Sequence, residues 1–370
     1  MFLLQYKYFC EAKHEENLSR TPFARLWKSC FPHVKIRALK AVEGKCTPCA
    51  LLSHARKSTF DSKSREYITC LHALHRSMYM GERLTYYKRR QEALESPEVV
   101  WSIIGDGMAQ QHCQLPYLAG LKQIDTLAQH LQGVLIHGKS IKVYRTFHNI
   151  KNSANLQIYS FLSTIEWLIQ ENDGNLPDTI YYQVDGGPEN TAKVMYGIAE
   201  LLVAKGIVVN LLITRLPVGH THEDIDSKFS LIWKEVWKKH VNTVQDYKEI
   251  IENALNGNNQ GKNCEVFDVF CIPDFESVIS ECMDSHFGRY AKLQWTQLQW
   301  RFQRVPISVN FPLGVKTTYR AFCQDEVWEI IKDSEKRVSV DECAKFSGFP
   351  KKIKNAIFLK AFTCFNDSQI

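Results

Sequence analysis

The chain has 370 residues, of which 45% are hydrophobic and 23% are charged, an ordinary composition for a globular protein large enough for more than one domain. It contains no run of about 18 apolar residues, and Lys7 interrupts the apolar start, so we expect neither a membrane span nor a signal peptide. Twelve cysteines in a chain of this length argue against a disulfide scaffold and favour reduced thiols. These features predict a nuclear or cytoplasmic protein.

Charge is unevenly spread along the chain. The net charge is +6, yet residues 1–90 hold 18 Lys and Arg against 7 Asp and Glu, and the remainder is mildly acidic. A basic N-terminal third beside an acidic body favours a polyanionic partner, with DNA first. A solvated helical surface without such a partner is the alternative.

Residues 1–98 predict a helical, basic module, because apolar residues recur at helical spacing over 21–31 and 65–94. Between these stretches lies a CxxC pair, and further potential ligands follow on the second stretch. The predicted structural Zn²⁺ site consists of Cys46, Cys49, His72 and His75. Cys70 on the same stretch leaves the identity of the second ligand pair open.

Residues 99–240 predict alternating strands and helices. Strands are expected at 99–104, 131–138, 141–147, 179–184 and 207–213, and helices at 153–170, 191–206 and 222–239. The order β-β-β-α-β-α-β-α is that of an RNase H-like α/β core with a mixed sheet. A doubly wound dinucleotide-binding sheet would need a helix and a Gly-rich turn after the first strand, and neither follows it.

The last third of the chain predicts less regular structure. Residues 241–264 predict a polar, turn-rich linker, and 265–370 predict a small α+β C-terminal region. Within this region, strand-like runs cover 298–311 and 317–322, and DEVWEIIKD at 325–333 predicts a helix.

Acidic residues stand where this topology would bring them together. Asp106 follows the first strand, Asp185 follows the fourth, and Glu223 opens the last helix with Asp224 and Asp226 close by. Converging carboxylates are the ligands that two-metal phosphodiester chemistry requires, with Mg²⁺ or Mn²⁺ as the ions. Each stretch also has a structural interpretation, namely Asp-Gly turns after the strands and a capping box at the helix start.

Three stretches carry a resemblance to known proteins: IIGDGMAQ at 103–110, LPDTIYYQVDGGPENTAK at 176–193 and TRLPVGHTHEDIDSKFSLIW at 214–233. A strand ending in Asp185, then a helix, a strand and a helix bearing Glu223, resembles the D,D-35-E core of retroviral-type integrases and DDE transposases. Together the stretches resemble an RNase H-like domain of unknown function in transposon-derived eukaryotic proteins. One departure is Gly186, which stands where integrases commonly have Asn.

This resemblance implies that Asp106, Asp185 and Glu223 bind the catalytic Mg²⁺ or Mn²⁺ ions, with Asp226 as the rival for the third position. The residues beside the site would be Glu189, Asn190, His220 and His222. A zinc-protease interpretation of H-E-x-x-D at 222–226 fails, because the second histidine of that motif is missing.

The resemblance further implies a transposase- or integrase-like protein that cleaves or joins DNA phosphodiesters in the nucleus and assembles as a homo-oligomer. We expect no membrane contact and no small-molecule substrate. Two alternatives stay open, an inactive domesticated module that binds DNA or protein and a stand-alone RNase H-like nuclease.

Overall fold

The computed structural model describes residues 6, 10, 13–14, 18–31, 46–120, 125–220, 224–257, 263–277, 279, 293–311 and 313–331. The chain divides into two compact units, residues 1–44 and 45–370. In the first unit, helix α2 (Arg20–Cys30) is lined by a run of aromatic rings four residues apart, in which Trp27 contacts both Phe23 and Phe31. None of the described helices has the length and apolar character needed to cross a membrane.

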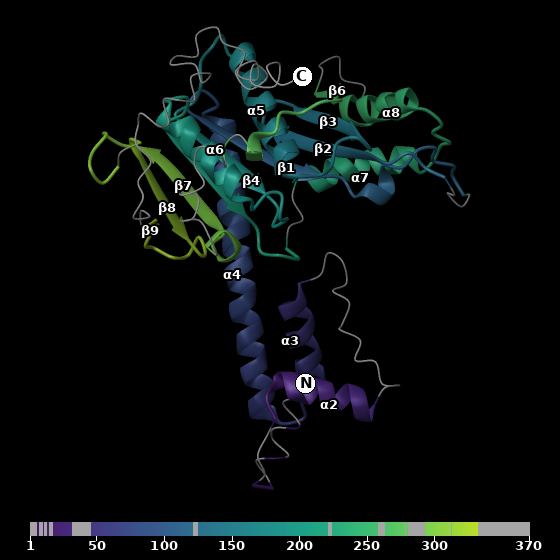
Figure 1. The fold of residues 1–370 in the computed structure, drawn as a ribbon, viewed down its shortest axis with the longest axis vertical. Coiled ribbons are helices and arrows are strands. Elements are labelled where there is room, and N and C mark those ends of the chain that lie inside the picture. Colours follow the sequence, from purple (N-terminus) through teal and green to yellow (C-terminus); the bar gives the residue numbers. More distant parts are fainter. Residues whose placement is uncertain are drawn as a thin grey trace. The chain divides into compact units, whose positions relative to one another are not determined.

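A mixed sheet organises the second unit (Figure 1). Its described strands are β1 (Val100–Gly107), β2 (Gln129–Ile136), β3 (Ile141–Phe147), β4 (Thr179–Val184), β5 (Asn210–Arg215), β6 (Cys264–Asp268), β7 (Gln299–Arg304), β8 (Val315–Arg320) and β9 (Glu329–Ile330). Their order across the sheet is β6-β3-β2-β1-β4-β5-β7-β8-β9. Strands β1, β2 and β3 are mutually antiparallel, whereas β4 runs parallel to β1 and β5 runs parallel to β4.

Helices cover both faces of this sheet (Figure 1). The described helices of the second unit are α3 (Thr47–Ser58), α4 (Ser62–Glu95), η1 (Gln110–His112), α5 (Ala154–Glu171), α6 (Lys193–Ala204), α7 (Asp224–Val236), α8 (Val244–Asn256) and α10 (Leu293–Thr296). Helices α5 and α6 pack on one face and α7 and α8 on the other. Neighbouring residues of β1 show the consequence, since Ile103 and Ile104 point to opposite faces and both are fully buried.

The C-terminal half of α4 packs on the same face as α7. Its buried residues, Glu82, Tyr86, Arg89 and Ala93, are spaced by three or four positions and form one stripe. Gln299 of β7 joins two of them, because its amide nitrogen donates to Glu82 (2.7 Å) and its oxygen accepts from Arg89 (3.2 Å). The N-terminal half of α4 packs against α3.

The predicted mixed α/β class is confirmed, and the described elements of 99–240 follow the predicted order. The bounds of β3 and β4 are those expected from the sequence. Strand β1 continues to Gly107, so Asp106 lies inside the strand, opposite Gly133 of β2, and not in a turn after it.

The C-terminal third differs from the prediction. The helix expected at 325–333 is absent from its described part, where residues 329–330 form β9 on the edge of β8. The guanidinium groups of Arg301 and Arg320 lie over the Trp328 ring, and these tertiary contacts override the local helical pattern. Residues beyond 331 lie outside the described part of the chain.

The predicted division into domains does not follow the sheet. The expected linker at 241–264 contains α8, whose start is fixed by a capping box between Thr243 and Asp246. Residues 258–262 of the expected linker lie outside the described residues. Strands β6 to β9, from the predicted linker and C-terminal region, belong to the same sheet as β1 to β5. Helix α4, from the predicted N-terminal module, packs on this sheet. Residues 45–331 therefore contribute to one structural body.

Gly133 on β2 lets α7 approach the sheet closely. A Cβ atom at Gly133 would lie 2.9 Å from Cζ of Phe229, so we expect Gly133→Ala to lower the free energy of unfolding by about 1–3 kcal/mol. Phe229→Leu should restore part of that loss in the double variant. Chemical denaturation measures both effects.

The matched control is Gly186→Ala, whose Cβ would meet its nearest neighbour, Val218, at an ordinary 3.5 Å. Equal destabilisation by the two glycine substitutions would contradict the close packing of α7 on β2.

Candidate functional site

Two aspartates lie side by side at the carboxyl edge of the sheet. Strands β1 and β4 are parallel with Gly105 opposite Val184, so the next residue of each chain segment, Asp106 and Asp185, stand in register. Because side chains alternate along a strand, the Asp106 carboxylate is directed to the same face as Ile104, which packs under α7. Asp185 directly follows the last residue of β4, and its charge acts on Asp106.

Helix α7 brings a third acid to this edge. Its residues Ile225 and Phe229 pack on Gly133, which pairs with Asp106 across β1 and β2. This docking places Asp226, in the first turn of α7, near enough for its charge to act on Asp106. Glu223, predicted as the third catalytic acid, lies outside the described residues.

Burial and neighbouring charge shift the titration of Asp106. Burial, then the charges of Asp185 and Asp226, raise the pKa of Asp106 to about 8, and Glu189 adds to the effect. The opposing stabilisation comes from the backbone N–H of Gly107, which donates to the Asp106 carboxylate at 2.7 Å. A divalent cation would relieve this repulsion, because its charge favours the ionised form of every acid around it.

Asp185 is held by a tight local network. One of its oxygens accepts hydrogen bonds from the backbone N–H of Gly187 (2.8 Å) and from the side-chain amide of Asn190 (2.6 Å). Asn190 is 2% exposed, so this hydrogen bond to Asp185 is shielded from water. A Cβ at Gly187 would lie about 3 Å from both the Asp185 and Glu189 carboxyl groups, so a larger residue there would have to displace one of them.

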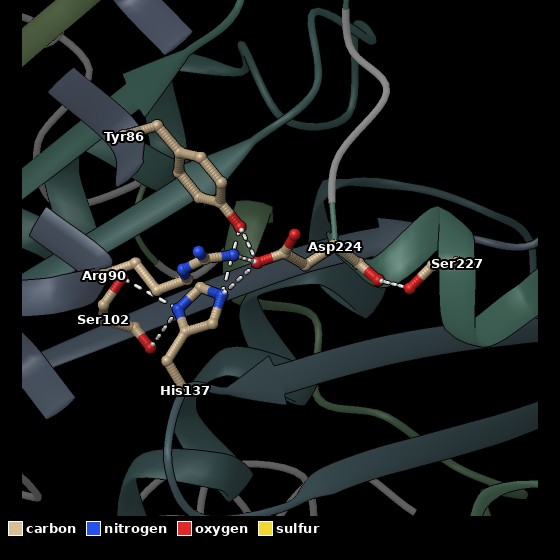
Figure 2. Close-up of polar contacts among 6 residues, drawn as sticks. All are labelled: Tyr86, Arg90, Ser102, His137, Asp224 and Ser227. Atoms are coloured by element: carbon tan, nitrogen blue, oxygen red, sulfur yellow. Dashed lines mark hydrogen bonds and ion pairs between the residues drawn. The ribbon is translucent and has the colours of Figure 1, made fainter. Parts of the chain in front are cut away.

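Asp224 belongs to a different arrangement, shown in Figure 2. Its carboxylate accepts from Arg90 of α4 (2.6 Å) and from the Tyr86 hydroxyl (3.2 Å), and it lies 3.3 Å from Nε2 of His137. Nδ1 of His137 in turn contacts Ser102 of β1. The contacts with His137 and then Arg90 lower the pKa of Asp224.

Asp224, predicted as a member of a capping box, has an anchoring role in the structure. Its side chain ties the first turn of α7 to α4 and to the turn between β2 and β3. Thr221, the partner expected in a capping box, lies outside the described residues.

A second cluster gathers four potential metal ligands. Cys46 precedes α3, Cys49 lies in its first turn, His75 lies on α4, and His220 lies between β5 and α7. Their ligand atoms all lie within 4.8 Å of one another. Among the described residues, the acids at the sheet edge do not form a group of three as compact as this cluster.

Local structure presents these side chains to one another. The backbone N–H of His220 donates to the carbonyl of Pro217 (2.9 Å), and Gly219 has the positive φ of 79° that this tight turn requires. The Tyr79 ring stacks on His220 at 3.6 Å between centroids and contacts the edge of His75 at 5.6 Å. Burial and then Cys46 raise the pKa of the Cys49 thiol.

The cluster differs from the zinc ligand set predicted from the sequence. Cys46, Cys49 and His75 are members, but His72 is not, and His220 takes the fourth place. His220 lies 145 residues from His75 along the chain, so only the tertiary structure brings them together. Cys70 is exposed and outside the cluster, and His222 lies outside the described residues.

A family model described as Domain of unknown function (DUF7869) matches residues 119–304, which is half of the chain. The chain belongs to the DUF7869 family. No curated protein and no solved structure is significantly similar to it. The DUF7869 match contains Asp185, His220 and Asp226, whereas Asp106 and the CxxC pair precede it.

The raised pKa of Asp106 predicts that this group lowers the free energy of unfolding of this DUF7869 protein in a pH-dependent way. Between the unfolded pKa of about 4 and the folded pKa of about 8, the folded state retains a proton that the unfolded state has lost. Stability from this group therefore falls as pH rises through that window. We expect Asp106→Asn to be more stable than wild type by a margin that grows from pH 4 to pH 8 and then levels off.

Denaturation of both proteins in chelator, at several pH values, measures this margin, which should reach roughly 1–3 kcal/mol. Asp178→Asn, an exposed acid before β4, is the control and should show a flat margin. A flat margin for Asp106→Asn would contradict the charge clustering.

The Asp224 network predicts a second stability effect. Arg90→Ala removes an ion pair in which both side chains are about two-thirds buried, so it should lower the free energy of unfolding by roughly 1–2 kcal/mol at pH 7. The loss should shrink only as pH falls well below about 4, because the lowered pKa keeps Asp224 of the folded protein ionised, and able to attract Arg90, until then. Lys238→Ala, which breaks an exposed pair with Glu235, should change nothing measurable.

Proposed function

We propose that this protein is a transposase- or integrase-like enzyme with an RNase H-like core, which uses divalent cations to cleave or join DNA phosphodiesters. The observation that carries the proposal is the register of β1 and β4, which sets Asp106 beside Asp185 at one end of two neighbouring parallel strands. The charge of Asp226, which acts on Asp106 from α7, supports the same assignment.

The sheet order supports the RNase H-like part of the proposal. Strands β3-β2-β1-β4-β5 are consecutive, the first three are antiparallel, and β4 and β5 run parallel to β1. This is the arrangement that the predicted element order requires, and it brings the ends of the first and fourth strands together.

The acids have distinct roles in the proposed chemistry. Asp106, Asp185 and Asp226 would hold Mg²⁺ or Mn²⁺, which when bound supplies Lewis-acid stabilisation and an activated nucleophile. Hydrogen bonds from Gly187 and Asn190 hold one oxygen of Asp185 and thereby orient the carboxylate, which leaves its other oxygen as the proposed ion ligand. Among the described residues Asp226 is the candidate for the third acid, because its charge acts on Asp106, and Glu223 stays the alternative.

Basic side chains beside Asp224 support DNA as the partner. Lys139 and Lys228 line a pocket of about 440 Å³ that also contains Asp224 and its ion-pair partner Arg90. Cations in such positions neutralise phosphates, so DNA binding through them weakens as the salt concentration rises.

The alternative function is a DNA-binding module that has lost its chemistry. The specific observation in its favour is that the described acids are less tightly gathered than the Cys and His cluster. Measurements of cleavage and of binding on the same proteins separate the two functions.

A cleavage assay tests the catalytic assignment. We expect Asp106→Asn, Asp185→Asn and Asp226→Asn to lower the Mn²⁺-dependent nicking of supercoiled DNA by at least about 100-fold, because each removes a proposed ion ligand. Asp178→Asn, at the opposite end of β4 from Asp185, is the matched control and should cleave like wild type. Glu223→Gln tests the rival acid in the same assay.

The outcomes are distinct. Equal nicking by wild type and Asp185→Asn would remove the sheet edge as the catalytic site. Salt-sensitive DNA binding without nicking, by wild type as well as by every variant, would favour the inert module. Joined products from a duplex with a free 3′-hydroxyl would distinguish a strand transferase from a stand-alone nuclease.

A further inference from the structure

The Cys and His cluster has the dimensions of a tetrahedral metal site. Zinc bonds of about 2.3 Å to sulfur and about 2.0–2.1 Å to nitrogen set separations of about 3.6 Å between S and N and about 3.3 Å between two nitrogens. The structure has 3.6 Å between Cys49 Sγ and His220 Nε2, and 3.4 Å between the Nε2 atoms of His75 and His220. Cys46 Sγ lies 3.1 Å from His75 Nε2, slightly closer than this ideal.

The two cysteines are presented from the start of one helix. Cys46 is the N-cap residue of α3 and Cys49 lies in its first turn, so both thiols lie at the same end of α3. Two imidazole nitrogens complete the set, so the four ligands fill every position of a tetrahedral ion. A site closed in this way is structural, because no coordination position is left for water or substrate.

We propose that Cys46, Cys49, His75 and His220 bind one structural Zn²⁺, and that this ion fixes the turn at 217–220, just before α7, to helices α3 and α4. Zinc thereby holds together segments separated by 171 residues between Cys49 and His220. The ion would add stability to the folded state, since the four ligands converge only there.

Tyr79 is the positioning residue of this centre. It lies one helical turn after His75 on α4, and its ring contacts both imidazoles. By stacking on His220 it sets the plane of that ring and the direction of Nε2. It touches no ligand sulfur among the described contacts, so its removal should weaken the site without abolishing it.

The centre also bears on the proposed chemistry, and this part rests on the proposed function. His220 stands six residues before Asp226, and α7 begins at Asp224. An ion that fixes the turn at 217–220 therefore fixes the start of the helix that carries the third acid.

Metal analysis of the full-length protein tests the ligand set. We expect one zinc per chain in wild type and in His72→Ala, and no stoichiometric zinc in Cys49→Ala or His220→Ala. His220→Cys should retain zinc, and its Co²⁺ derivative should show stronger thiolate-to-metal absorption than the wild-type derivative. Tyr79→Ala should weaken Zn²⁺ binding by about 10-fold in competition with a chelator.

Separate readouts keep this proposal apart from the proposed enzyme. Asp106→Asn and Asp185→Asn should retain one zinc per chain whether or not the protein cleaves DNA. Hydrogen exchange should rise at 216–220 in wild type when zinc is removed by chelator, and should be restored by added zinc. If Cys49→Ala does not fold, the pair His72→Ala and His220→Cys still decides the assignment.

Several results would overturn the proposal. One is the absence of zinc from the wild-type protein after purification without chelator and titration with ZnCl₂. A second is loss of zinc in His72→Ala together with its retention in His220→Ala. A third is a Cys46–Cys49 disulfide, detected as protection from alkylation, in zinc-free protein that exchanges no faster at 216–220.

Discussion

The parallel pairing of β1 with β4 is the constraint on which the candidate site depends. Because Gly105 lies opposite Val184, the residues that follow, Asp106 and Asp185, lie together at one edge of the sheet. A shift of one residue in this register would take these two residues out of alignment. Apolar packing on both faces resists that shift, since Ile103 and Ile104 are each fully buried on their own side.

Helix α7 is fixed to this edge by contacts of two kinds. Apolar packing holds it against β2, where Gly133 leaves room for the Phe229 ring. Polar contacts hold its first turn, where Asp224 meets Arg90 and His137. The two acids after Glu223 therefore have different roles. Asp224 anchors the helix, and the charge of Asp226 acts on Asp106.

The sequence predicts the central part of the fold well, for a physical reason. Buried strands such as β3 and β4 read as short apolar runs, and helices such as α5 show the 3.6-residue period, so both are visible locally. The C-terminal third lacks such signals. Strand β9 is two residues long and depends on its pairing with β8 and on the arginines over Trp328, which no local pattern encodes.

The candidate site divides in the same way. Asp106 and Asp185 could be singled out because they follow strands whose neighbourhood the topology fixes. The role of Asn190 as the amide partner of Asp185, and that of His220 beside the CxxC pair, depend on a turn and on a contact across 145 residues. The local signal for the bend that presents His220 is the glycine directly before it, Gly219.

Helix α4 touches the chain on both sides of Glu223. Through His75 it reaches His220, and fifteen residues further on, through Arg90, it reaches Asp224. A helix rises about 1.5 Å per residue, so His75 and Arg90 lie about 22 Å apart along its axis. One continuous helix thus contacts both the Cys and His cluster and the start of α7, so a substitution in the middle of α4 that breaks it would separate these two sites structurally.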